Sequence, residues 1–314
     1  MRAVLCLALA LLALPVQAQT SARFSFAIVG DAPYNTLEEF VFAQELKEID
    51  QEDLAFVVHV GDIKSGGSPC SDALFAKRLQ QFQSVRHPFI YVPGDNEWTD
   101  CHHSGADPLE RLAKLREMFY PDGNSLGERK LKLERQSADP RFAEYRENAR
   151  WRIGPALFIG LNIPGSNNNF GRTPQMDDEY ARRGQANSAW LAEGFELAKK
   201  NGDAAVFIAM QADLFFERAS RYPANVTDCY AQFKQELLAH TLAFGKPVIL
   251  IHGDTHRYRV DHPLVDPATR KPVENFTRIE SFGSPFVDWI KVSVDPANPK
   301  LLTIETGTEI KQAR

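Results

Sequence analysis

Short apolar runs alternate with amphipathic stretches along most of the chain. The runs are near-continuous Val, Ile, Phe and Ala, which is typical of strands buried on both faces. They fall at residues 23–30, 55–61, 88–93, 155–161, 204–210 and 247–252. Helical spacing and capping residues predict helices over 36–50, 71–85, 107–120, 188–202 and 229–245. This order predicts an α/β protein with a mostly parallel sheet and helices on its faces.

Two regions depart from that alternation. Residues 119–152 are rich in charge, Pro and Gly, and we expect them to form an excursion on the surface. From residue 277 onward, the segments RIESFG, FVDWIKVSV and LLTIET are typical of antiparallel strands, which we expect to form a second sheet packed on the first. No fixed-period repeat or linker divides the chain, so residues 19–314 are expected to form a single domain.

Residues 1–18 have the composition of a secretory signal. A positive start at Arg2 precedes an apolar run and then small residues before Gln19. The run is too short for a transmembrane helix. An uncleaved N-terminal anchor is the alternative. We expect cleavage near Ala18 and an exported protein, periplasmic or secreted, without stable membrane insertion.

Composition agrees with a soluble globular protein. Apolar residues make up 44% of the chain and charged residues 25%, and the net charge is −5. Because the chain has no basic stripe and no run of like charges, we expect no nucleic-acid partner. The sequence does not indicate an oligomeric state.

The mature chain keeps three cysteines. An odd number in an oxidising compartment predicts one disulfide and one free thiol. Cys70 and Cys101 each follow a Gly-Asp turn by a few residues, whereas Cys229 lies far away in the sequence. If those turns share one sheet edge, Cys70 and Cys101 lie close enough to pair.

Acidic turns follow four of the apolar runs. They are GDAPY with Asp31, GDIKS with Asp62, GDNEW with Asp95 and GDTHR with Asp254. A single Gly-Asp dipeptide usually marks a turn or a helix cap. Four of them after buried strands are expected to meet at one sheet edge. Because carboxylates brought together repel one another, this convergence predicts divalent cations between them.

The order of these motifs resembles that of the calcineurin-like metallophosphoesterases, over about residues 24–260. The resemblance implies an α/β fold in which a two-sheet β-sandwich is flanked by helices, giving four layers. It also implies two metal ions at the sheet edge and a metal-activated water that attacks phosphorus in line. A small phosphorylated molecule is the implied substrate.

The resemblance assigns ligand roles to individual residues. Asp31 matches the aspartate on the first metal, and Asp62 matches the aspartate that bridges both metals. Asp95 stands where the family has an Asn ligand of the second metal. Asp254 and His256 take the places of the two histidines in the last motif.

Several family histidines are absent here. Pro33 replaces one ligand, Gln211 stands where another is found, and Asn96 occupies the position of the catalytic His. The predicted metal ligands are therefore Asp31, Asp62, Asp95, Gln211, Asp254 and His256. Replacing imidazole by oxygen donors favours Mg²⁺ or Mn²⁺, with Ca²⁺, Zn²⁺ and iron as alternatives. Four carboxylates suffice to neutralise two divalent ions.

Candidates for catalysis and substrate binding lie near these motifs. Since Asn96 cannot act as a general acid, His102 and His103 are candidate replacements, with exposed loop histidines as the alternative. Lys64 and Arg257 flank the motifs and are candidate phosphate ligands, or else surface charges. Asn162 begins the amide-rich segment 162–172, which we expect to line the pocket.

The sequence supports three functional hypotheses. The first is an exported, metal-dependent phosphoesterase that hydrolyses phosphate mono- or diesters. Loss of the family histidines motivates the second, a catalytically impaired protein that binds a metal or a phosphorylated ligand on the same fold. In the third, the acidic turns bind Ca²⁺ only to stabilise the fold, although the alternating oxygen donors of a calcium loop are absent.

Overall fold

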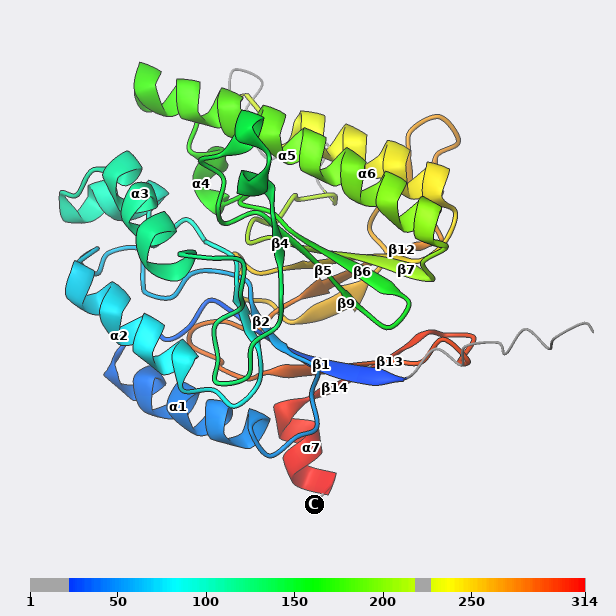
Figure 1. The fold of residues 1–314 in the computed structure, drawn as a ribbon, viewed down its shortest axis with the longest axis horizontal. Coiled ribbons are helices and arrows are strands. Elements are labelled where there is room, and N and C mark those ends of the chain that lie inside the picture. Colours follow the sequence, from blue (N-terminus) through cyan, green and yellow to red (C-terminus); the bar gives the residue numbers. More distant parts are fainter. Residues whose placement is uncertain (1–22, 218–226, 314) are drawn as a thin grey trace, which may run out of the picture.

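Two β-sheets lie face to face in the middle of the molecule, and helices cover the outer face of each (Figure 1). The computed structural model describes residues 23–217 and 227–313, so the predicted signal at residues 1–18 lies outside the described residues. In the described part, no helix combines the length and apolar character needed to cross a membrane.

The first sheet has the strand order β14-β13-β1-β2-β3. Strands β1, β2 and β3 are parallel to one another. Strand β13 pairs antiparallel with β1, and β14 pairs antiparallel with β13. The bounds are β1 (Phe24–Val29), β2 (Val57–His59), β3 (Phe89–Tyr91), β13 (Ile290–Val294) and β14 (Leu302–Thr306).

The second sheet has the strand order β4-β5-β6-β7-β8-β12-β9. Strands β6, β7, β8 and β12 are parallel. The bounds are β4 (Glu134–Arg135), β5 (Ala149–Ile153), β6 (Ala156–Gly160), β7 (Ala205–Ala209), β8 (Val248–His252), β9 (Arg259–Asp261) and β12 (Phe276–Glu280). A separate short hairpin joins β10 (Val265–Asp266) to β11 (Lys271–Pro272).

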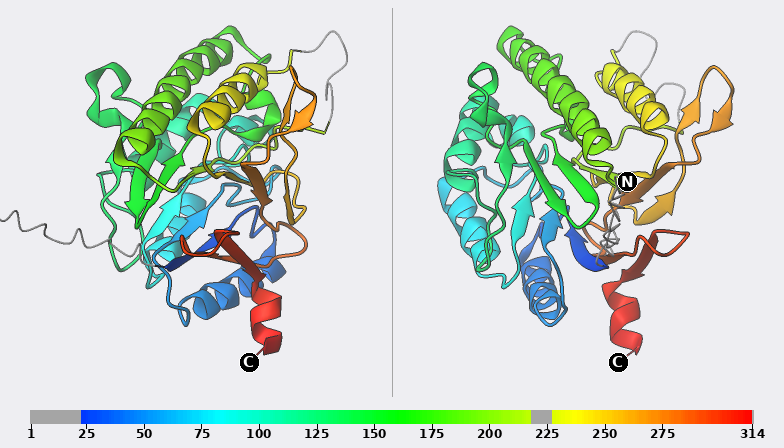
Figure 2. Two further views of the ribbon diagram at one scale, coloured as in Figure 1. Left: turned by 90° about the vertical axis from the view of Figure 1, so that its right-hand side faces the viewer. Right: turned by 45° about the vertical axis from the view of Figure 1, so that its right-hand side comes forward.

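The helices form the two outer layers. The first sheet packs against α1 (Thr36–Ile49), α2 (Asp72–Gln83) and α3 (Pro108–Phe119), and the second against α5 (Pro174–Asn201) and α6 (Ala231–Phe244). Figure 2 shows these layers from two further sides. Shorter helices are η1 (Thr99–Ser104), η2 (Gln136–Ala138), η3 (Pro140–Phe142), α4 (Gly165–Asn168) and α7 (Gly307–Ala313). The side chains of Asn35, Ser71 and Asp107 cap the first turns of α1, α2 and α3.

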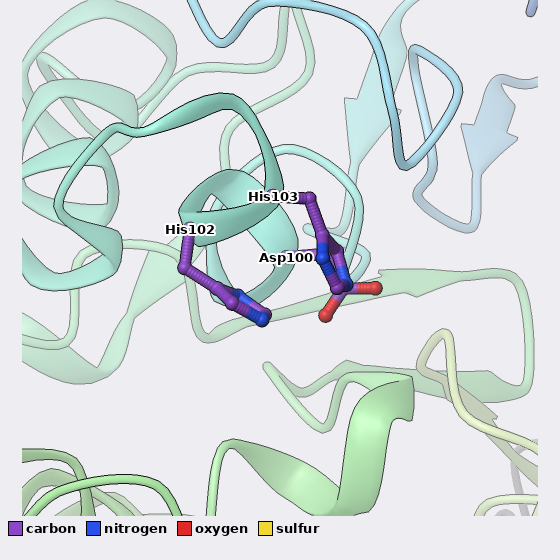
Figure 3. Close-up of side chains that lie close together, drawn as sticks. All are labelled: Asp100, His102 and His103. Atoms are coloured by element: carbon purple, nitrogen blue, oxygen red, sulfur yellow. The ribbon is translucent and has the colours of Figure 1, made fainter.

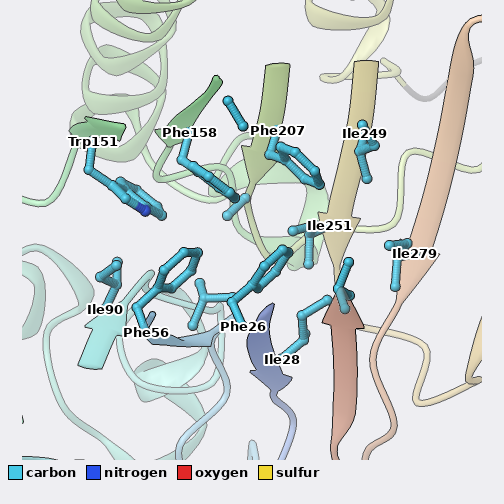
Figure 4. Close-up of a cluster of buried hydrophobic side chains, with 14 of the residues drawn as sticks. Phe26, Ile28, Phe56, Ile90, Trp151, Phe158, Phe207, Ile249, Ile251 and Ile279 are labelled. Carbon is cyan, nitrogen blue, oxygen red and sulfur yellow. The ribbon is translucent and has the colours of Figure 1, made fainter. Parts of the chain in front are cut away.

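Aromatic side chains fill the space between the sheets (Figure 4). Phe26 of the first sheet stacks on Phe56, and Phe158 of the second stacks on Phe207. Phe26 also meets both Phe158 and Phe207 edge-on. Because these contacts cross from sheet to sheet, they hold the two layers in one fixed relation. The predicted four-layer, two-sheet fold is confirmed.

Two details of the predicted sheets are wrong. The six predicted strands do not share one sheet but divide equally between the two. The C-terminal strands do not form a sheet of their own either. β12 joins the second sheet parallel to β8, while β13 and β14 extend the first. The pattern of apolar residues indicates which strands are buried, but it does not indicate which strands are neighbours in a sheet.

Segment 119–152 and helix α5 also differ from the predictions made from the sequence. Segment 119–152 is not only a surface excursion, because it contains β4 and the start of β5, whose Trp151 is buried in the core. Helix α5 begins at Pro174, well before the predicted start at residue 188. Its first turns bury Glu179 and Arg183, which form an ion pair, so the buried face lacks the apolar pattern that would reveal it.

A buried carboxyl on α1 yields a prediction about stability. Burial raises the pKa of Glu45 from 4.5 to about 8, and the charge of Asp288 adds to this effect. Since the folded-state pKa lies above the unfolded one, Glu45 costs increasing stability as the pH rises from 4.5 to about 8. Glu45→Gln should therefore stabilise the protein by roughly 1–3 kcal/mol at pH 9 and by little near pH 5.

Thermal melts of both proteins at the two pH values test this. Glu117→Gln, which changes an exposed carboxylate on α3, serves as the control and should have little effect at either pH. An equal stability difference between Glu45→Gln and the wild type at both pH values would contradict the raised pKa.

Candidate metal centre

The predicted carboxylates meet where the carboxyl ends of both sheets come together. Asp31, Asp62 and Asp95 follow strands β1, β2 and β3 of the first sheet, and Asp254 follows β8 of the second. The Asp254 amide donates a hydrogen bond of 2.9 Å to Asp31 Oδ1. The Asn96 amide donates one of 3.0 Å to Asp62 Oδ1. The structure thus brings these residues together as the sequence predicts.

Glycines allow the carboxylates to lie against neighbouring turns. A Cβ on Gly94 would lie 2.1 Å from Asp62 Oδ1, and one on Gly253 would lie 2.0 Å from Asp31 Oδ2. Any side chain at either position would displace the carboxylate. The turns themselves are also constrained, since Asp31 and Asp62 have φ values of 50° and 59° in the left-handed region.

Three side chains offer ligand atoms to a common point. One atom each from Asp31, Asp62 and His256 lies within 4.8 Å of the others. His256 Nδ1 lies 2.7 Å from the Ser284 carbonyl oxygen, which can only accept a hydrogen bond. Nδ1 therefore carries a proton, so in the neutral imidazole Nε2 has the lone pair, and Nε2 lies 3.7 Å from Asp31 Oδ1. This is how a metal-binding imidazole is held in proteins.

Burial disfavours the charged form of these carboxylates. Burial raises the pKa of both Asp31 and Asp62 well above the ordinary value, and neighbouring carboxylates raise it further. Burial likewise raises the pKa of Asp95. A divalent cation would offset both the lost hydration and the repulsion. The donor set of two carboxylates and one imidazole therefore fits a divalent metal ion.

Gln211, the predicted amide ligand, turns a different group toward the carboxylates. Its Nε2 donates to Asp95 Oδ1 at 2.9 Å and to Asp254 Oδ1 at 3.4 Å. Its Oε1 accepts a hydrogen bond of 2.5 Å from the Gly165 amide. The oxygen that would bind a metal thus points away from Asp95 and Asp254 in this arrangement.

Glu97 holds the surrounding turns in place. This fully buried carboxylate accepts hydrogen bonds from the amides of Asp62, Ile63 and Gly94 and from the Tyr91 hydroxyl. It therefore ties the turn after β2 to the turn after β3. The role of Glu97 in positioning Asp62 emerges from the structure.

Tyr34 is a residue of the centre that the sequence analysis missed. Its hydroxyl donates to Asp62 Oδ2 at 3.1 Å and accepts from Asn96 Nδ2 at 2.8 Å. It also lies 3.2 Å from His256 Nε2. The available signal was its place three residues after Asp31, directly after Pro33. Burial and the charge of Asp62 raise the pKa of Tyr34 well above its usual value, so the phenol stays protonated.

Two predicted substrate ligands instead support the loops. Lys64 is buried, and its Nζ donates to the carbonyl oxygens of Ser65 and Asn96. Asn162 is also buried, and its Nδ2 donates to Glu147 Oε1. These polar groups are already used inside the protein, and the substrate-binding roles of both residues stay predictions.

Segment 162–172 still reaches the centre, but through other residues. The Gly165 amide contacts Gln211, and Ser166 Oγ donates to Asp95 Oδ2 at 2.8 Å. Residues 166–169 all have positive φ, which Asn tolerates better than most residues. This left-handed turn directs the two donors toward the carboxylates.

His102 and His103 form a separate group with Asp100 on η1 (Figure 3). Both imidazoles are exposed, and His102 Nδ1 lies 2.9 Å from the Thr99 carbonyl oxygen. Arg172 pairs with Asp100 at 3.0 Å. These histidines gather around Asp100 rather than around Asp31 and Asp62, and their catalytic role stays a prediction. Arg257 is exposed, and its role in substrate binding also stays a prediction.

The predicted disulfide is confirmed. Cys70 and Cys101 are bonded, and Cys229 is a buried free thiol. The bond joins the segment after β2 to η1, beside the turns that carry Asp62 and Asp95. His59 and His252 are fully buried, as expected for structural histidines. Burial lowers the pKa of His59 to about 3, so it stays neutral.

Comparisons with known proteins support the fold. No protein-family model matches the chain, and no curated protein matches its sequence. Among solved structures, PhoD superposes with a TM-score of 0.55 at 13% identity, covering 90% of this chain and 68% of PhoD. A dimetal phosphatase from Danio rerio gives 0.50 at 14% identity, with 90% and 98% covered.

A purple acid phosphatase from yellow lupin (Lupinus luteus) superposes with a TM-score of 0.52 at 14% identity. The match covers 91% of this chain and 51% of the lupin protein, so the chain spans about half the length of that enzyme. All three resemblances extend over nearly the whole of this chain at low sequence identity. The protein thus has the fold of the calcineurin-like metallophosphoesterases.

Proposed function

We propose that this protein is an exported phosphoesterase that hydrolyses small phosphate mono- or diesters at a divalent metal centre. The observation that carries the proposal is the convergence of Asp31, Asp62 and His256, whose ligand atoms lie within 4.8 Å of one another. The fold, which this chain shares with PhoD and a dimetal phosphatase, supports the same conclusion.

A bound divalent ion would supply Lewis-acid polarisation of a phosphoryl oxygen and would lower the pKa of a water molecule. Asp31, Asp62 and the Nε2 atom of His256 would hold that ion. The two carboxylates favour Mg²⁺ or Mn²⁺, and the imidazole also suits Zn²⁺ or iron. Glu97 and Ser284 contribute indirectly, since they fix the positions of Asp62 and His256.

Tyr34 is suited to replace the missing catalytic histidine. Asn96 occupies that position in the sequence, and its amide donates directly to the Tyr34 hydroxyl. Because the phenol stays protonated, its one hydrogen can turn from Asp62 Oδ2 to a developing negative charge on the leaving oxygen. In this proposal, Asn96 orients Tyr34, and Tyr34 assists the departure of the leaving group.

Export is supported by two independent features. Residues 1–18 have the pattern of a signal, and a disulfide joins Cys70 to Cys101. Disulfides persist in oxidising compartments and are rare in a reducing cytosol. Cell fractionation and N-terminal sequencing of the processed protein test this part of the proposal, which predicts a new N-terminus at Gln19.

Hydrolysis should require a divalent metal ion. Chelation with EDTA should abolish hydrolysis of an aryl phosphate or its diester, and Mn²⁺ or Mg²⁺ should restore it. Asp62→Asn should reduce kcat/KM by about 10²-fold or more, since it removes a charged ligand. Asp178→Asn, an exposed position on α5, should have no effect. Full activity of Asp62→Asn after EDTA treatment would contradict the proposal.

The second prediction concerns pH. Asp31 and Asp62 have raised pKa values, so at low pH they must release protons before they bind a metal. The increase in Tm caused by Mn²⁺ should therefore be larger at pH 8 than at pH 5. Thermal melts with and without metal measure this difference, and Asp62→Asn should remove most of it. A larger increase at pH 5 would reverse the expected sign.

The third prediction tests Tyr34. Tyr34→Phe should lower kcat about 10- to 100-fold on an ester with a poor leaving group, such as phenyl phosphate. The loss should be smaller on p-nitrophenyl phosphate, whose leaving group needs little assistance. Tyr180→Phe is the matched control, because it removes a hydroxyl that donates to the Cys229 carbonyl oxygen. Equal losses on both esters would argue against proton donation.

A further inference from the structure

The resemblance implies two metal ions, but the residues present do not fit two. We infer that the centre holds one divalent ion and that the side-chain amide of Gln211 takes the place of the second. This inference rests on the proposed function, because it concerns the same centre. It narrows the ligand set to Asp31, Asp62 and His256.

The orientation of the Gln211 amide is the first support. An amide side chain can be turned over without changing its shape, so its neighbours must decide which end is nitrogen. Here the Gly165 backbone amide lies 2.5 Å from one end and can only donate. That end must be the oxygen. The NH₂ group consequently faces Asp95 and Asp254, and both of these contacts suit a donor.

The NH₂ group bridges the two carboxylates as a cation would. Its two hydrogens point to Asp95 Oδ1 at 2.9 Å and Asp254 Oδ1 at 3.4 Å. A metal ion in this position would need oxygen ligands at roughly 2.0–2.2 Å and no N–H group directed at it. Gln211 is fully buried, so the amide has no room to move aside into solvent.

The remaining oxygens of these carboxylates also have donors. Asp95 Oδ2 accepts a hydrogen bond of 2.8 Å from Ser166 Oγ, and Asp254 Oδ2 accepts one of 3.0 Å from the Asp213 amide. Neutral donors therefore surround both carboxylates from several sides. Such a network stabilises buried carboxylates without a cation.

The half of the centre around His256 differs from the half around Gln211, because it offers a lone pair that can bind a metal. His256 donates from Nδ1 to Ser284, which leaves the Nε2 lone pair directed at Asp31. No comparable acceptor faces Asp95 and Asp254 among the contacts of Gln211, because its oxygen is bound to Gly165. One half of the centre thus presents a metal ligand, and the other presents hydrogen-bond donors.

Metal stoichiometry tests this inference on the whole mature protein. Isothermal titration with Mn²⁺, together with elemental analysis after desalting, should give one ion per wild-type chain. Electron paramagnetic resonance should show an isolated Mn²⁺ ion without coupling to a neighbour. Asp95→Asn should also bind one ion, with an affinity within about threefold of the wild type, since Asp95 is not a ligand in this scheme.

Gln211→Glu is the decisive variant. It has the same shape, but it replaces the NH₂ group with an oxygen that faces two carboxylates. This change should create a second site and raise the stoichiometry to two ions, with a coupled Mn²⁺ spectrum. Gln185→Glu, which adds the same charge at an exposed position on α5, should still bind one ion.

The outcomes separate this inference from the proposed function. Two ions in the wild type, or loss of the single ion in Asp95→Asn, would overturn the inference while leaving the proposed metal dependence intact. A folded wild-type protein that binds no ion would overturn both. If Gln211→Glu does not fold, the wild-type and Asp95→Asn stoichiometries still decide the question.

Discussion

Repulsion among buried carboxylates is the constraint on which this structure depends. Asp31, Asp62 and Asp95 are buried where water cannot hydrate them well, and the half-buried Asp254 joins them from the second sheet. In the fold, N–H donors and closely packed glycines surround these carboxylates. The loops around the edge are organised to keep these groups together, and Glu97 is the main link between the turns after β2 and β3.

The centre combines two ways of stabilising a buried anion. Beside His256, a lone pair and two carboxylates are arranged so that a metal completes them. Beside Gln211, amide and hydroxyl groups already satisfy the carboxylates. Replacing a histidine by Gln or Asn changes more than the identity of a ligand. The replacement also changes whether a neighbouring carboxylate can bind a metal or instead accepts a hydrogen bond.

The sequence predicted much of this arrangement. Continuous apolar runs located the buried strands, and the Gly-Asp turns after them located the four carboxylates. The sequence did not reveal how side chains turn at the site. Tyr34 was missed although it lies three residues after Asp31, because its contacts with Asp62 depend on the folded turn, and the amide orientation of Gln211 depends on Gly165. The sequence also did not reveal the buried hydrogen bonds of Lys64 and Asn162, because their partners come from other segments.

The centre is assembled from residues near both ends of the described chain. Asp31 follows the first strand, whereas Asp254 and His256 follow the eighth, and a hydrogen bond closes this separation of 223 residues. A fragment that lacks the last motif has the first carboxylates but not the imidazole. An ion bound at the proposed centre would therefore stabilise only the completed fold, because its ligands come from both sheets.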